Sequence, residues 1–119
     1  MKYVMVIYQG STPLPGSDEW NAVPQEQQRQ VYADYDALNK TPGVTPGPPM
    51  GRPENATTVR VADGRTLVTD GPFVGMKEAV GGMFVLEAEH LDAAIEVATR
   101  VPAARLGGAI EIRPVQTYW

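Results

Sequence analysis

Residues 67–83 (LVTDGPFVGMKEAVGGM) place an acid at the start of a turn. Asp70 follows three residues typical of a strand, and Gly71 and Pro72 then break that strand. An aspartate in this position can simply hydrogen-bond its own downstream backbone amides, which is a structural role. A partly buried carboxyl group has a raised pKa instead, and can take a proton from a bound small molecule or return one. Both roles are open for Asp70.

Four further side chains could contact a substrate. Tyr8 ends an apolar, strand-like run, and Tyr35 falls on the apolar side of a helical pattern. Their phenols either belong to the core or donate a hydrogen bond to a substrate oxygen. Phe73 adds an apolar ring just beyond the turn. Lys77 either forms a solvated ion pair with the glutamate that follows it or holds an anionic group of a ligand.

Other chemistries lack the residues they need. The chain has no cysteine, and its one histidine, His90, stands where a helix should begin, without partners at metal-ligand spacing. Serine occurs only at positions 11 and 17, so no nucleophilic triad is visible. Gly81 and Gly82 are expected to let the chain bend into the next strand, not to bind phosphate. We expect no metal and no cofactor, which leaves acid–base chemistry or plain binding.

Length and charge narrow the class of protein. A chain of 119 residues is the size of one domain, spanning residues 1–119. The net charge of −4 and the scattered basic residues argue against nucleic-acid binding. The apolar start (MKYVMVIYQG) is too short for a membrane span and has no cleavage site, so we expect neither membrane insertion nor export. Because cysteine is absent, a cytoplasmic location is the simplest interpretation.

Hydrophobic patterns predict the elements that position these residues. Residues 2–8 are apolar on both faces of the pleat, as in a central strand. Residues 57–62 and 65–69 are joined by Asp63 and Gly64, the strongest short-range signal for a β-hairpin. The other predicted elements are a loop over 9–22, a helix over 24–39, a proline-rich edge segment or flap over 41–53, a strand over 82–88, a helix from 91 that ends near 102, and an edge strand over 109–115.

The order of these elements is βαββαβ with an extra hairpin, which predicts an α+β, ferredoxin-like fold. In that arrangement two helices cover one face of a four-stranded sheet and leave the other face bare. An uncovered apolar sheet is normally buried by a second copy, so we expect a homodimer. We assign seven apolar side chains to the bare face: Tyr3, Met5, Ile7, Met83, Val85, Ile110 and Ile112.

Several motifs resemble the YCII-related proteins of the DGPF type. They are TDGPF at 69–73, KE at 77–78 and GG at 81–82, together with ATTVR at 56–60, PAAR at 102–105 and EIRPV at 111–115. Each block is short, but their order and spacing are specific, and the resemblance covers nearly the whole chain. Two features depart from the family. The usual apolar strand after the first helix is replaced by TPGVTPGPPMGRP, and no histidine lies near the first helix, so a histidine–aspartate dyad cannot be carried over.

The resemblance implies a dimeric α/β barrel in which two ferredoxin-like protomers pack sheet to sheet. Each protomer of that family has a small cleft with an acid as its proposed functional group, which singles out Asp70 here. The family also implies lyase- or hydrolase-like reactions on small cyclic or aromatic compounds. Our first hypothesis is therefore a cofactor-free acid–base enzyme with Asp70 in a barrel cleft lined by Tyr8 and Tyr35. The alternative is a non-catalytic ligand-binding or regulatory module, connected with extracytoplasmic sigma factors.

Overall fold

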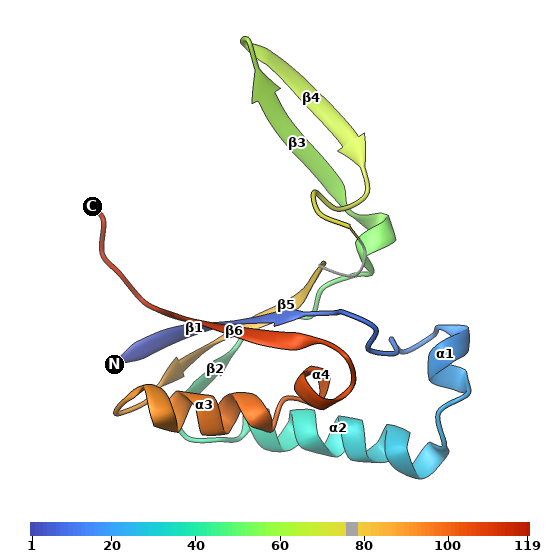
Figure 1. Ribbon diagram of the computed structural model, residues 1–119, viewed down its shortest axis with the longest axis vertical. Coiled ribbons are helices and arrows are strands. Elements are labelled where there is room, and N and C mark those ends of the chain that lie inside the picture. Colours follow the sequence, from blue (N-terminus) through green and yellow to red (C-terminus); the bar gives the residue numbers. More distant parts are fainter. Residues whose placement is uncertain (76–78) are drawn as a thin grey trace.

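A four-stranded antiparallel sheet forms the centre of the molecule in the computed structural model, which describes residues 1–75 and 79–119 (Figure 1). Its strand order is β2-β5-β1-β6, which is the ferredoxin-like order with an inserted hairpin. The central position of β1 confirms the interpretation of the apolar run at the start of the chain, and β2 and β6 lie at the edges as their prolines require. The strands are β1 (Lys2–Tyr8), β2 (Val44–Pro46), β5 (Val80–Glu87) and β6 (Ala109–Pro114).

Helices cover one face of this sheet (Figure 1). The two long helices were predicted, but the short α1 and α4 lie where the sequence indicated only a loop and a helix end. Ser17 starts α1 by accepting a hydrogen bond from the Trp20 amide, and the His90 ring starts α3 by accepting one from the Ala93 amide. The helices are α1 (Asp18–Asn21), α2 (Gln25–Asn39), α3 (Leu91–Thr99) and α4 (Pro102–Arg105), with one 3₁₀ turn, η1 (Pro53–Asn55).

The predicted hairpin is confirmed as β3 (Thr57–Ala62) and β4 (Arg65–Asp70). Asp63 and Gly64 form its turn with φ values of 51° and 73°. Positive φ at both central residues matches the right-handed twist of the two strands. The hairpin pairs with no other strand of the described chain and projects from the side of the sheet opposite the helices (Figure 1).

The core lies between the sheet and the helices. Its residues show that the predicted assignment of side chains to the bare sheet face was partly wrong. Tyr3 and Met5 are buried in it, and Ile7, Ile110 and Ile112 pack against it, so these five side chains face the helices and not the bare side. They alternate along their strands with the residues of the opposite face. The open sheet face, defined here by its apolar side chains, consists of Val4, Val6, Met83 and Val85.

Two local features belong to β5 and β6. Gly81 and Gly82 lie inside β5 without positive φ, and Gly81 is left unpaired where the register between β1 and β5 shifts, an irregularity at which a strand can bend. A Cβ atom on Gly81 would lie 1.8 Å from the Gln9 amide oxygen, so this glycine also leaves room for the Gln9 side chain. On the last strand, Arg113 forms an ion pair with Glu111 two residues away.

A surface ion pair ties α2 to α4. Asp34 accepts a hydrogen bond from the Gln30 amide at 2.8 Å and one from the Arg105 guanidinium at 2.6 Å. These contacts hold the pKa of the Asp34 carboxyl group below its ordinary value. A carboxyl group with a lowered pKa stabilises the fold at neutral pH, and that contribution is lost as the pH falls through the lowered pKa. The pair is partly exposed, so its contribution to stability is small.

Candidate ligand-binding site

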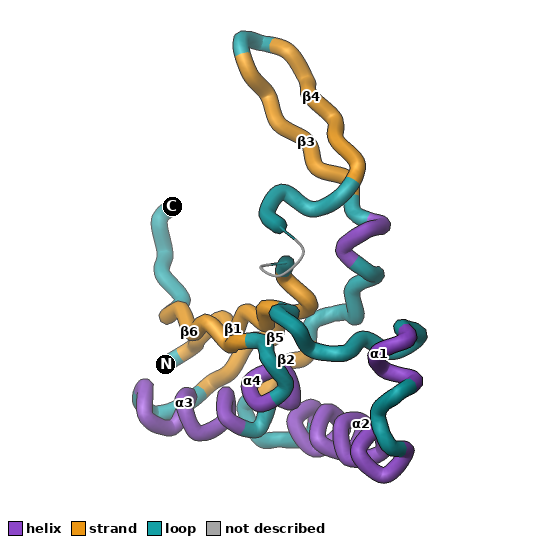
Figure 2. Tube along the Cα trace, turned by 45° about the vertical axis from the view of Figure 1, so that its right-hand side comes forward, coloured by secondary structure: helices purple, strands orange, loops and turns teal. Residues whose placement is uncertain are grey.

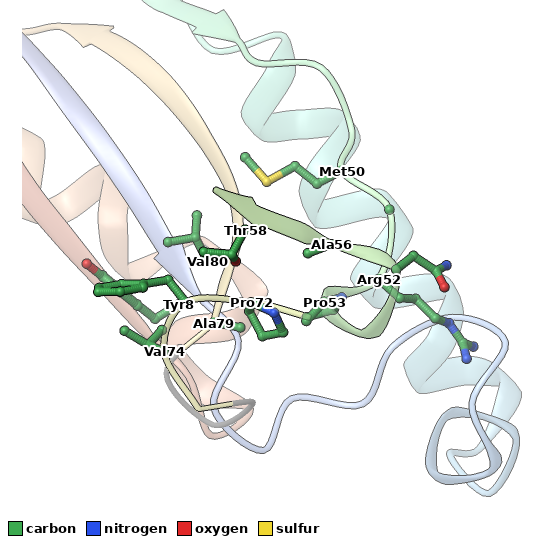
Figure 3. A pocket seen from close by; sticks show the side chains of 13 residues that line it. Tyr8, Met50, Arg52, Pro53, Ala56, Thr58, Pro72, Val74, Ala79 and Val80 are labelled. Atoms are coloured by element: carbon green, nitrogen blue, oxygen red, sulfur yellow. The ribbon is translucent and has the colours of Figure 1, made fainter. Parts of the chain in front are cut away.

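A pocket of about 650 Å³ lies where the hairpin joins the sheet (Figure 3). Its walls come from the end of β1, the start of β3, the segment after β4, the start of β5 and the segment around η1. Most of the lining is apolar, and the volume suits a small organic ligand. The lining residues are Tyr8, Met50, Gly51, Arg52, Pro53, Asn55, Ala56, Thr58, Pro72, Phe73, Val74, Ala79 and Val80.

Hydrogen bonds at the base of the hairpin hold one wall in place. The Thr58 hydroxyl donates to the Gly71 carbonyl at 2.7 Å, and the Gly71 amide donates to the Ala56 carbonyl at 2.7 Å. Gly71 has a φ of 98°, which a residue with a side chain rarely adopts. The chain therefore turns sharply after β4, and this turn brings Pro72 and Phe73 to the pocket.

Tyr8 occupies the opposite wall because β1 ends there. The register between β1 and β5 shifts between Ile7 and Tyr8, and Tyr8 pairs with Val80, which also lines the pocket. The Tyr8 hydroxyl lies 3.4 Å from a carboxylate oxygen of Glu111. The phenol thus has a partner of its own next to the pocket, and its ring supplies part of the wall (Figure 3).

The polar groups of the lining are few and mostly neutral. They are the Tyr8 hydroxyl, the Asn55 amide and the Thr58 hydroxyl, and of the described residues that line the pocket none is Asp, Glu or His. The Arg52 guanidinium lies 3.2 Å from the Pro15 carbonyl and 3.5 Å from the Glu54 carboxylate, and it points away from Tyr8 (Figure 3). This lining can hold an apolar molecule and bond one or two of its polar atoms.

The pocket is open on one side. Phe73 is 72% exposed although it lines the pocket, and Val74 and Val80 are also exposed. The Arg60 guanidinium lies 5.6 Å from the centre of the Phe73 ring, a cation–π contact that orients the ring. Apolar walls that remain exposed in the single chain are available to a ligand or to another protein surface.

Asp70 does not line this pocket. It pairs with Thr57 across the hairpin, whereas Thr58, the next residue, does line the pocket. Because successive strand side chains point to opposite faces, Asp70 lies on the face of the hairpin away from Thr58. The partial burial that acid–base catalysis requires is absent from the single chain, where Asp70 is exposed. The turn hydrogen bond, which was one of the two roles open for Asp70, is not observed either, because among the described residues the Gly71 amide donates to the Ala56 carbonyl instead.

The other predicted site residues are only partly brought together. Tyr8 and Phe73 line the same pocket, but Tyr35 lines a different cavity of about 440 Å³ between α2, the proline-rich segment and β5. Burial raises the pKa of the Tyr35 phenol there. Lys77 lies outside the described residues. Thr58 and Met50 also line the first pocket but were not predicted, and the one available signal was the unusual proline-rich segment that contains Met50.

The described residues contain neither a cluster of metal-ligand side chains nor a helix able to span a membrane. Within residues 1–75 and 79–119, no three His, Cys, Asp or Glu side chains lie together as metal ligands would. No helix in those ranges combines the length and apolar character needed to cross a membrane.

Comparison with known proteins identifies the domain. The profile of the YCII-related domain matches residues 1–118. A 64-residue segment is 36% identical to an uncharacterized protein from Rhizobium meliloti (strain 1021), and it represents 53% of this chain and 52% of that relative. The chain thus spans about half the length of the curated relative it matches.

Proposed function

The chain belongs to the YCII-related family, and we propose that it binds a small, largely apolar molecule in the pocket at the base of the hairpin. The observation that carries this proposal is the pocket itself, which combines apolar walls with the neutral polar groups of Tyr8, Asn55 and Thr58. Sites for small molecules are typically concave and mainly apolar, with a few polar groups that fix orientation. Because the chain has no cysteine, we place this activity in the cytoplasm.

The chemistry of the lining favours a neutral ligand over an anionic one. Arg52 is the one cation among the described lining residues, and its guanidinium is directed toward Pro15 and Glu54. A small aromatic or lactone compound would fill the apolar walls and accept a hydrogen bond through its carbonyl oxygen. The Asn55 amide can donate that hydrogen bond, whereas the Thr58 hydroxyl, whose hydrogen is donated to the Gly71 carbonyl, can accept one from the ligand.

Filling the pocket should abolish binding. A thermal-shift screen of neutral aromatic and lactone compounds, with coumarin as the reference probe, should yield compounds that raise the Tm of the wild-type protein. A ligand at ten times its Kd adds about 1.4 kcal/mol, or roughly 5 °C in a domain of this size. In Ala56→Trp the indole would occupy the pocket, so these shifts should disappear.

Ala62→Trp is the matched control, because Ala62 lies at the far end of β3, which begins directly after Ala56, and does not line the pocket. It should retain the full shift. A panel that leaves the wild-type Tm unchanged, or a shift that survives in Ala56→Trp, would contradict the proposed site.

Acid–base catalysis by Asp70 is the second candidate function. One observation favours it: this exposed carboxylate lies only two residues before Pro72, which lines the pocket. A single general acid or base accelerates a reaction by about 10²–10⁴-fold. The compounds that shift the Tm should then be incubated with the protein and the products detected by NMR. In Asp70→Asn the rate of turnover should fall by that factor while the thermal shift persists.

Asp63→Asn provides the matched control, because Asp63 is an acid at the opposite end of the same hairpin. It should keep the turnover rate of the wild type. Thermal shifts without any product in the wild-type protein would favour the non-catalytic binding module instead.

We also propose that the protein acts as a homodimer. The open sheet face of Val4, Val6, Met83 and Val85 supports this proposal, because none of the helices that the structure describes covers it (Figure 1). Light scattering during gel filtration should give a mass near twice the 12.9 kDa of the chain. A mass of one chain at micromolar concentration would contradict the dimer.

A further inference from the structure

Residues 47–52, called the strap below, connect β2 to η1 and pass beside the start of β5 (Figures 1 and 2). At one end of the strap, the Gly47 amide donates a hydrogen bond to the Met83 carbonyl at 3.1 Å. At the other end, the Arg52 guanidinium donates one to the Pro15 carbonyl at 3.2 Å. Among the described residues, the backbone of residues 48–51 has no hydrogen-bond partner. The strap is therefore fastened at its two ends, and its middle can shift without breaking any of these hydrogen bonds.

Three cavities lie along the strap. The first is the pocket of about 650 Å³ at the base of the hairpin, and the second is the cavity of about 440 Å³ between α2, the strap and β5, called the helix-side cavity below. A third cavity of about 210 Å³, called the middle cavity, shares Arg52 and Pro53 with the pocket. It shares Gln9 and Gly81 with the helix-side cavity, and Met50 lines all three. The middle cavity thus borders both of the larger ones.

Two glycines of β5 keep side chains out of the region between the larger cavities. Val80 lines the pocket and Gly82 lines the helix-side cavity, so the two cavities lie on either side of Gly81 along one strand. Within 4 Å of a Cβ atom added to Gly82 there would be only the Ile7 Cδ1 atom, at 3.6 Å. No side chain of β5 therefore separates the pocket from the helix-side cavity at these two positions.

Gln9 supplies the polar group at this point. Its carboxamide lies against Gly81, and the half-buried side chain lines both the middle cavity and the helix-side cavity. None of the side-chain hydrogen bonds within residues 1–75 and 79–119 uses it. A carboxamide both donates and accepts hydrogen bonds, and the polar groups that a protein buries are normally paired. Gln9 is therefore matched to the amide group of a ligand, which has the same two requirements.

The helix-side cavity is uncharged and apolar where it meets the core. Leu38 and Phe84 of the core line it, together with Ile7, which packs against the core. None of the described residues that line it is Asp, Glu, His, Lys or Arg. The middle cavity that leads to it is small, and an extended alkyl chain passes through a narrow space more easily than a ring does. Alkyl groups also gain free energy on leaving water for apolar surroundings.

We propose that the three cavities form one elongated site, which binds a neutral ring joined through an amide to an alkyl chain. This inference rests on the proposed function, because the ring occupies the pocket at the base of the hairpin. The amide lies in the middle cavity against Gln9, and the chain enters the helix-side cavity. Val80 and Phe84 line the two ends and are four residues apart on β5, which corresponds to about 13 Å. A single ring is too short to reach both ends.

Met50 opens and closes the passage between the cavities. Its side chain extends from the strap over the pocket (Figure 3), and it is 48% exposed. Methionine has three rotatable side-chain bonds and adapts to irregular spaces. The backbone of Met50 lies in the part of the strap that has no hydrogen bond to a described residue. The thioether can therefore move aside for the alkyl chain and pack against it afterwards.

Two anilides of different chain length test the elongated site. Acetanilide and hexananilide share the ring and the amide, and the second has four more methylene groups in its chain. Calorimetric titration of the wild-type protein should give a Kd for hexananilide at least about tenfold lower than that for acetanilide, because burial of each methylene group favours binding. Equal Kd values for the two compounds would overturn the extension into the helix-side cavity.

Gly82→Leu tests where the chain lies. Gly82 pairs with Ile7, which packs against the core, so the new side chain points into the helix-side cavity. The Kd for hexananilide should rise to that for acetanilide, whereas the Kd for acetanilide should stay within about twofold of the wild-type value, which also shows that the variant is folded. Val85→Leu is the matched control, because Val85 lies on the same strand and on the open sheet face. It should keep the tenfold difference between the two anilides.

Gln9→Leu tests the polar group, because it removes the carboxamide and keeps a side chain of similar size. The Kd values for both anilides should rise by about five- to tenfold, the effect of one lost hydrogen bond. Coumarin, which has no amide and fills only the pocket, should bind as it does to the wild type.

The same titrations separate failure of the elongated site from failure of the proposed function. Coumarin binding without any effect of chain length, or an effect of chain length that survives in Gly82→Leu, would overturn the elongated site and leave ligand binding at the pocket standing. Absence of binding for coumarin and for both anilides would overturn both proposals.

Discussion

Phe84→Ala is expected to lower the free energy of unfolding by about 3–5 kcal/mol. Phe84 is 3% exposed and stands directly opposite Met5 in the middle of the sheet, where Met5 is completely buried. Removing the ring deletes its buried apolar surface and leaves a cavity between the sheet and the helices. Because small domains are stable by only about 5–15 kcal/mol, urea denaturation should show a large fall in the midpoint.

The chain supplies a matched control, because its second phenylalanine makes no comparable contact. Phe73→Ala removes the same ring at a position that is 72% exposed. Its cost in stability should stay within about 0.5 kcal/mol. Phe73→Ala should instead weaken ligand binding, because Phe73 lines the pocket. Equal losses of stability in the two variants would mean that Phe73 is buried in solution.

The sequence predicted most of the fold because most of the elements are specified by local chemistry. Asp63 and Gly64 specify the hairpin turn, and a two-residue turn also fixes every pair in the ladder. The prolines of the segment at 41–53 exclude a helix and a central strand, and β2 forms at the sheet edge as that requires.

The faces of the central sheet could not be predicted in the same way. Residues 2–8 (KYVMVIY) are apolar at both odd and even positions. The alternation of side chains therefore does not indicate whether the odd or the even positions face the helices. The face that is buried depends on packing with Leu38, Phe84 and Leu86 from distant parts of the chain. Tyr3 and Met5 were assigned to the wrong face for this reason.

The sequence predicted some residues of the candidate site, but it did not predict how they are arranged in space. The turn after β4 brings Phe73 to the pocket, and the end of β1 brings Tyr8. The hairpin register already implied that Asp70 shares a face with Val59 and Val68. Which face of the hairpin meets the pocket depends on how Gly71 turns the chain toward Ala56, a tertiary hydrogen bond that no local pattern encodes. Catalysis by Asp70 and the homodimer stay predictions.

Gly10→Ala is expected to cost about 3 kcal/mol, although it adds only one methyl group. Gly10 has a φ of 56°, and a Cβ atom there would lie 1.9 Å from the Gly107 carbonyl oxygen. The Ser11 amide also donates to that carbonyl at 3.1 Å. The loop after β1 and the turn before β6 therefore meet through their backbones, and neither can move aside as a flexible side chain would. Left-handed strain and overpacking both oppose the new methyl group.

Urea denaturation of alanine variants at two other glycines separates the cost of left-handed strain from the cost of overpacking. Gly64→Ala has the strain alone, because its φ is 73° but nothing lies within 4 Å of the added Cβ, and it should cost about 1 kcal/mol. Gly51→Ala has neither strain nor a close contact and should be nearly neutral. If Gly10→Ala costs no more than Gly64→Ala, the two loops can separate. Tyr8, two residues before Gly10, would then shift with its loop, and ligand affinity at the pocket should fall in Gly10→Ala but not in Gly64→Ala.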